Sequence, residues 1–111
     1  MKKYNMKIGV ILSTKEPEKA WNAFRFANTA IKQGHELKLF LMGEAVECES
    51  IQNEHYNVVA QMKTFQDLHG EILACGTCLK SRRLEETTSC PISTMVDCVN
   101  LVCWADKVVS F

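Results

Sequence analysis

The stretch EILACGTCLKSRR, residues 71–83, decides the fold because it joins a short apolar strand to a cysteine pair and a charged turn. Glu71 to Ala74 is predicted as a strand, and Leu79 to Arg83 as a short helix. Cys75 and Cys78 fall in the connection between the two. A buried strand that leads directly into a helix is the unit from which α/β folds are built.

The rest of the chain repeats this alternation. The residues Glu36 to Met42 are apolar on both faces of a predicted strand, which is typical of a parallel sheet covered by helices on both sides. Further strands are predicted over Lys7–Leu12 and Lys107–Phe111. The pattern therefore predicts a compact three-layer sandwich with right-handed crossovers.

Three longer helices are predicted from apolar residues spaced three and four apart. The first runs from Glu18 to Gln33. The second follows Asn57 as a cap and is closed by Gly70, and the third follows Ser93 or Thr94 and runs to about Trp104. Their expected buried residues are Ala20, Phe24, Ala27 and Ile31; Val58, Met62 and Phe65; and Met95, Val99 and Val102, with Cys98 and Cys103 as core residues beside the last stripe.

Length and charge exclude several classes of protein. With 111 residues, the chain is predicted to form a single domain over residues 1–111. Its 13 basic and 13 acidic residues cancel, so we expect no binding to nucleic acid or to an anionic membrane. No apolar run approaches the roughly 20 residues that span a bilayer. The basic segment Met1–Asn5 leads straight into a strand and does not resemble a signal peptide.

The chain has six cysteines, which a secreted disulfide scaffold could also explain. Such scaffolds are rich in loops and carry export signals, whereas this chain has strong apolar periodicity and no such signal. We therefore expect a cytoplasmic protein with reduced thiols.

Cys75 and Cys78 are the residues best placed for chemistry. Ligand sites in parallel sheets gather beyond the carboxyl ends of the strands, where Cys75 is predicted to lie. Exposed N–H groups and the nearby Lys80 and Arg82 would favour a thiolate. Gly76 has no side chain to obstruct a partner sulfur. A basic thiol pair at the end of a strand suits sulfur or redox exchange.

The run Ala74–Arg82 resembles the cysteine loop of DsrE/DsrF-like proteins, which include sulfur-relay subunits. The segments Lys7–Leu12, Leu39–Gly43 and Ala105–Phe111 extend the resemblance. It implies a flavodoxin-like three-layer α/β/α sandwich with a mainly parallel sheet of four or five strands. It also implies a homo-oligomer (dimer, trimer or hexamer) in which Cys75 accepts persulfide sulfur from a donor protein and passes it to an acceptor protein. Cys78 departs from the sulfur-relay pattern.

The predicted site comprises catalytic and substrate-binding residues. Cys75 carries the persulfide and Cys78 resolves it, while substrate contacts are expected from Gly76, Thr77, Lys80 and Arg82. No cofactor or metal is expected. The loop Ser13–Glu18 lacks the glycine that a phosphate-binding turn needs.

Two alternatives remain open at the level of the sequence. The first is a non-catalytic oligomeric module whose cysteines are structural or bind zinc. Cys90 could join Cys75 and Cys78, which would give a zinc ion three protein ligands at most. Cys98 and Cys103 are about 140° apart around a helix, so they cannot easily hold one ion together. The second is a thiol-disulfide redox protein.

Overall fold

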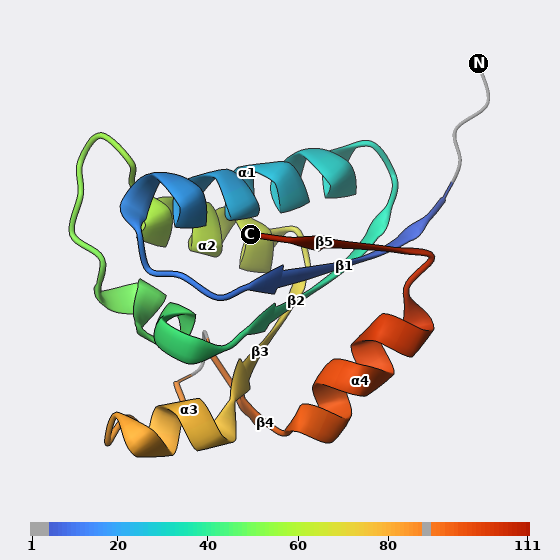
Figure 1. The fold of residues 1–111 in the computed structure, drawn as a ribbon. Helices are drawn as coiled ribbons and strands as arrows, with labels where there is room; N and C mark the ends of the chain where they lie inside the picture. Colours follow the sequence, from blue (N-terminus) through green and yellow to red (C-terminus); the bar gives the residue numbers. More distant parts are fainter. Residues whose placement is uncertain (1–4, 88–89) are drawn as a thin grey trace.

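The computed structural model describes residues 5–87 and 90–111. Residues 1–4 of the basic N-terminal segment and residues 88–89 of the predicted surface loop Leu84–Cys90 lie outside the described part. Strands and helices alternate as expected (Figure 1). The elements in chain order are β1 (Lys7–Leu12), α1 (Pro17–Lys32), β2 (Glu36–Leu41), the 3-10 helix η1 (Gly43–Ser50), α2 (Val58–Asp67), β3 (Glu71–Cys75), α3 (Gly76–Ser81), β4 (Ile92–Ser93), α4 (Met95–Trp104) and β5 (Lys107–Ser110).

The strands form one sheet in the order β4-β3-β2-β1-β5, and every pair is parallel. The two-residue strand β4 has no counterpart in the sequence prediction, since two residues show no periodicity. It extends the sheet by pairing Ile92 with Ala74 and Ser93 with Cys75. Strand β4 therefore lies directly beside the end of β3 that leads into the cysteine pair.

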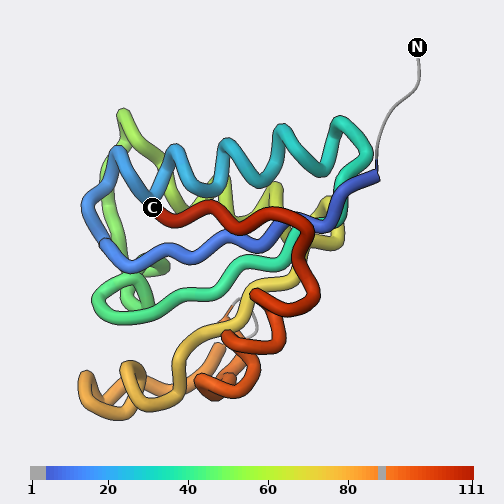
Figure 2. Tube along the Cα trace, turned by 45° about the vertical axis from the view of Figure 1, so that its right-hand side comes forward, coloured from blue at the N-terminus to red at the C-terminus, as the bar shows by residue number. Residues whose placement is uncertain are grey.

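Helices cover the two faces of the sheet unequally. The chain moves stepwise from β1 to β4 with α1 and α2 on one face, then returns through α4 on the other face to reach β5 beside β1 (Figures 1 and 2). A right-handed crossover that steps along the sheet in one direction places its helix on one face, and a crossover that steps back in the other direction places its helix on the opposite face. The helix α4 therefore covers the face that α1 and α2 leave open. The expected three-layer α/β/α sandwich with a parallel sheet is confirmed.

The face toward α1 and α2 is densely packed. Val10, Leu12, Leu39 and Leu41 of the two central strands have no exposed surface. The helices that cover them bury the predicted residues Ala20, Phe24 and Ala27 on α1 and Val58, Met62 and Phe65 on α2. The predicted apolar stripes of these two helices are therefore confirmed, except that Ile31, at the end of the α1 stripe, is only partly buried against the core.

The predicted inner stripe of α4 is wrong. Met95, Val99 and Val102 are 54, 55 and 45% exposed, whereas Cys98 and Leu101 are buried. The helix turns this way because Leu101 packs onto the bare backbone of Gly9, where an added Cβ would lie 2.4 Å from the Leu101 side chain. Cys98 is a core residue as expected, but Cys103 is exposed.

The ends of the helices follow their sequence signals with one correction. Asn57 caps α2, and Thr94 rather than Ser93 caps α4 in a reciprocal capping box with Asp97. At the end of α2 the left-handed residue is His69, with φ of 66°, and not Gly70. Gly70 instead makes room for the Phe65 ring, which an added Cβ would meet at 2.4 Å.

Among the described residues, no helix is long and apolar enough to cross a membrane.

Candidate functional site

The cysteine pair lies at the carboxyl end of β3, as predicted. Cys75 is the last residue of the strand and the N-cap of α3, and α3 begins at Gly76 rather than at Leu79. Cys78 is therefore the third residue of the helix. Cys75 and Cys78 thus lie three residues apart at the start of this helix. Contact between the two thiols is, after burial, a cause that raises the pKa of Cys78.

Cys78 is half-buried and meets a main-chain donor from another strand end. The N–H group of Gly43, the first residue of η1, donates to the Cys78 Sγ atom at 3.2 Å. Burial raises the pKa of the Cys78 thiol, as does the contact with Cys75, while the Gly43 N–H group and Arg82 act in the opposite direction. The Gly43 N–H group and Arg82 can thus stabilise a Cys78 thiolate, but burial and the contact with Cys75 favour the neutral thiol overall.

Cys75 is almost enclosed, with 3% of its surface exposed. Strand residues alternate between the two faces of a sheet, and the register aligns Cys75 with the face that α4 covers. Burial, and secondarily the nearby Cys75, raises the pKa of Cys98 on α4. Cys75 is thus buried, whereas Cys78, the other member of the predicted pair, is partly exposed to solvent.

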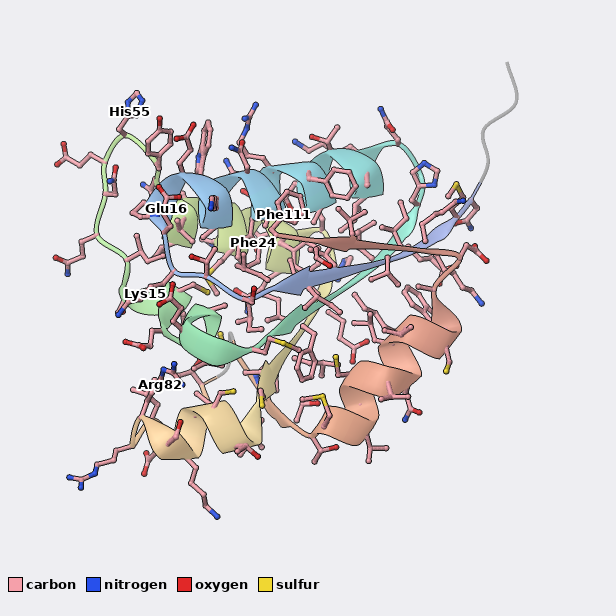
Figure 3. All side chains as sticks on the ribbon, viewed as in Figure 1. Lys15, Glu16, Phe24, His55, Arg82 and Phe111 are labelled. Atoms are coloured by element: carbon pink, nitrogen blue, oxygen red, sulfur yellow. The ribbon has the colours of Figure 1, made fainter. Side chains whose placement is uncertain are left out.

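Glu47 of η1 is the centre of a charged network beside the pair. Its carboxylate accepts from the Arg82 Nε at 2.9 Å and from the Lys15 Nζ at 3.2 Å. Figure 3 shows Lys15 and Arg82 on either side of η1. These two hydrogen bonds lower the pKa of Glu47. Arg82, expected from the sequence to contact substrate, is held by Glu47 and also donates to the Cys78 carbonyl oxygen at 3.2 Å.

Glu44 ties the loop after β1 to the same 3-10 helix. It accepts from the Thr14 hydroxyl at 3.0 Å and from the Lys15 N–H at 3.1 Å. The backbone bond from Lys15 is the main cause that lowers the pKa of Glu44. The carboxyl ends of β1, β2 and β3 are thereby joined through side chains.

The other predicted contact residues lie on the side of α3 that faces β4. Gly76, Thr77 and Lys80 line a hollow of about 410 Å³ together with residues 92–95 and Asp97. Gly76, expected to leave room for a partner sulfur, has a structural role in the fold. A Cβ at this position would lie 2.9 Å from the Ser93 carbonyl oxygen, so the glycine allows β4 to approach the helix.

Two further cysteines form a separate buried pair. Cys48 of η1 is fully buried, and Cys90 is 2% exposed. Contact with Cys48, followed by burial, raises the pKa of Cys90 far above the ordinary thiol range. Within residues 5–87 and 90–111, no group of three or more His, Cys, Asp or Glu side chains is arranged to hold a metal ion.

Fold and site together define an α/β protein with a thiol pair at the carboxyl edge of a parallel sheet. The chain belongs to the DsrE/DsrF-like family, whose model matches residues 6–111.

Relatives and a solved structure extend this result. An uncharacterized protein of Methanocaldococcus jannaschii, MJ0989, is 34% identical over 96% of this chain and its own full length. An uncharacterized protein of Methanopyrus kandleri, MK0008, is 36% identical over 85% of this chain and 83% of its own. The crystal structure of the ychN protein from E. coli superimposes with a TM-score of 0.84 and 25% identity, covering 96% of this chain and 99% of that chain.

Sequence reasoning missed two residues of this site. Gly43 stands directly after an apolar strand, which is a signal for a turn at the carboxyl edge, and its φ of 57° fits that position. Glu47 lies in a polar stretch without clear periodicity, residues 44–56, where no local pattern marks it as a partner of Arg82. Its contact with Arg82 joins residues that are 35 positions apart in the sequence.

Proposed function

We propose that this protein is a sulfur carrier that holds a persulfide on Cys75, with Cys78 as the resolving thiol. The observation that carries the proposal is the contact between the two thiols at the carboxyl edge of the sheet, with the Gly43 N–H group directed at the Cys78 sulfur. Membership of the DsrE/DsrF-like family supports it.

The chemistry moves one sulfur atom without net oxidation. A thiolate of the pair attacks the outer sulfur of a donor persulfide, a new S–S bond forms, and the donor leaves as a thiolate. An acceptor thiolate removes the sulfur from Cys75 by the same reaction. Alternatively, Cys78 attacks the inner sulfur of the Cys75 persulfide, which forms a Cys75–Cys78 disulfide and releases hydrosulfide. Donor and acceptor are proteins in this proposal, and a cytoplasmic setting keeps the remaining thiols reduced.

The charged residues near the pair would act on the anionic sulfur. Lys80 lies on the exposed side of α3 and can meet an incoming donor. Burial raises the pKa of Cys78, and Arg82, which is itself oriented by Glu47, offsets a small part of that rise. Gly76 and Thr77 line the hollow beside Lys80, where a partner protein would make contact.

A homo-oligomer is the second part of the proposal, and the exposed face of α4 supports it. Met95, Val96, Val99 and Val102 are all exposed on this helix, with Ile92 just before it. Monomeric proteins seldom leave such a contiguous apolar surface uncovered. A second copy of the chain offers the same apolar face, so a dimer, trimer or hexamer can bury it. A non-catalytic oligomeric module would use this face as well, and sulfur loading separates the two functions.

Intact-mass spectrometry tests the carrier function. After incubation with inorganic polysulfide, the wild-type protein is expected to gain one reducible sulfur atom per chain. The double variant Cys75→Ser/Cys78→Ser should gain none. Cys103→Ser removes an exposed thiol on α4 and serves as the matched control that loads normally. Loading of the double variant to the wild-type level would refute the proposal. A loss of two hydrogens without added sulfur would indicate a thiol-disulfide redox protein.

A further inference from the structure

The two thiols of the pair do not have equal access to a donor. Cys75 is 3% exposed and ends a strand between β4 and β2, whereas Cys78 is half-buried on the first turn of α3. Sulfur transfer requires the attacking sulfur to reach the outer sulfur of the donor along the S–S axis. Cys78 is therefore more accessible than Cys75 to a protein-bound persulfide.

The surroundings of Cys78 also suit the entry of an anion. The Gly43 N–H group lies 3.2 Å from its sulfur, which is hydrogen-bond distance for an N–H group and a thiolate or persulfide. This donor is fixed by the main chain, since Gly43 starts η1 with a positive φ of 57°. The Arg82 guanidinium, held by Glu47, binds the carbonyl oxygen of Cys78 and places a positive charge beside it.

We infer that Cys78 is the entry thiol of the carrier: it takes the sulfur from the donor and hands it to Cys75, which stores it. The inference rests on the proposed function and adds a direction to it. In the first step the Cys78 thiolate attacks the outer sulfur of the donor, and the donor leaves as a thiolate. In the second step Cys75 attacks that same sulfur, the bond from Cys78 to it breaks, and the proton of the Cys75 thiol passes to Cys78. Neither step needs an oxidant or a reductant.

Storage on Cys75 follows from its burial. A persulfide enclosed between β3 and α4 is shielded from small reductants in water, whereas one on Cys78 is accessible to them. The exchange passes between two thiols that contact each other at the start of α3.

Single-turnover loading with glutathione persulfide tests the order of events. Cys75→Ser is expected to take up one sulfur atom, on Cys78, at nearly the wild-type rate, and to lose it rapidly to added reductant. Cys78→Ser is expected to load Cys75 at least about tenfold more slowly than the wild type, since the donor must reach a buried sulfur. Cys103→Ser is the control for the loss of a thiol and should load like the wild type.

A second measurement uses the wild-type fold. In the Cys103→Ser background, which lacks the most exposed thiol, brief treatment with iodoacetamide should modify Cys78 ahead of Cys75. Protein modified only on Cys78 should then fail to load. Loading of Cys78→Ser at the wild-type rate, or normal loading of protein alkylated on Cys78, would overturn the entry role and leave the carrier function intact. No sulfur uptake by the wild type or by either single variant would instead refute the carrier function itself.

Discussion

Six thiols in one short chain occupy very different surroundings. Cys48, Cys75, Cys90 and Cys98 are buried, Cys78 is half-buried and Cys103 is exposed. The thiolate is the reactive form, and burial disfavours it. The composition does not distinguish these cysteines. In the folded protein Cys78 and Cys103 are the two that are accessible, and Cys78 lies at the candidate site.

Alkylation rates should follow this ranking. Under native conditions iodoacetamide is expected to modify Cys103 first and Cys78 second, and to leave Cys48 and Cys90 unmodified until the protein unfolds. Peptide mass spectrometry over a time course gives the order, and a sample in urea shows that all six thiols can react. Rapid native modification of Cys90 would contradict the burial described here.

The pair Cys48 and Cys90 also predicts a dependence of stability on pH. Contact with Cys48 and burial raise the pKa of Cys90 in the folded state, so the unfolded chain loses this proton first as pH rises. The resulting stabilisation is complete below the pKa of an ordinary thiol, about 8.5, and is lost above it. In urea unfolding between about pH 7 and 10, the wild type should lose stability more steeply than Cys90→Ala. Cys103→Ser should keep the wild-type slope, and identical slopes for Cys90→Ala and the wild type would refute the prediction.

At the scale of the elements, the position of α3 depends on β4 as much as on its own sequence. This short helix contacts β3, η1 and β4, and Gly76 allows the approach of β4. The two-residue strand β4 in turn receives a bond from the Ala74 N–H group to the Pro91 carbonyl oxygen at 2.9 Å. The orientation of Cys78 is therefore fixed by residues on three elements.

Gly76→Ala should destabilise the protein by about 1–3 kcal/mol, because the new methyl group meets a backbone oxygen that cannot move freely. Thermal or urea unfolding measures the effect. Thr77→Ala, an exposed position in the same turn, is the matched control and should change the free energy of unfolding by less than about 0.5 kcal/mol. Equal stability of the two variants would show that β4 is not packed against α3 as described.

The N-terminal cap of α4 has a measurable contribution as well. The Thr94 hydroxyl accepts from the Asp97 N–H, and the Asp97 carboxylate accepts from the Thr94 N–H at 3.0 Å. Thr94→Ala should therefore cost about 1 kcal/mol in the free energy of unfolding. Thr94→Ser, which keeps the hydroxyl, should restore most of it, and a neutral Thr94→Ala would argue against the cap.

At the scale of the whole molecule, the sheet is covered by two helices on one face and by one on the other. Phe40 is buried on the face toward α4, but Val108 of the edge strand β5 is 40% exposed. The outward side of α4 adds further apolar surface. The thinner layer of the sandwich is therefore the one that a second copy would complete.

Val99→Asp should dissociate the proposed oligomer, because it places a charge in the apolar face through which we propose that the copies associate. Sedimentation velocity or light scattering after gel filtration gives the mass. Val59→Asp is the matched control, since Val59 is an exposed valine on α2, 45% accessible and on the opposite side of the sheet. A wild-type protein that is monomeric at high concentration would contradict the prediction, as would dissociation by the control alone.

Local patterns predicted most of the architecture. The apolar strands, the stripes of α1 and α2 and the position of Cys75 at a strand end follow from periodicity and caps within a few residues of each other. The spacing of Cys75 and Cys78 placed both residues at the start of one short helix, where their thiols are in contact.

Tertiary packing alone decided the rest. The helix α4 has one apolar side with Met95 and Val99 and another with Cys98 and Leu101. The side with Cys98 and Leu101 is buried, because Leu101 packs against the backbone of Gly9. The Gly43 N–H group reaches Cys78, and Glu47 reaches Arg82, across 35 residues of sequence in each case. Such contacts depend on which strand ends become neighbours in the sheet. The residues around one partner therefore do not allow the other partner to be predicted.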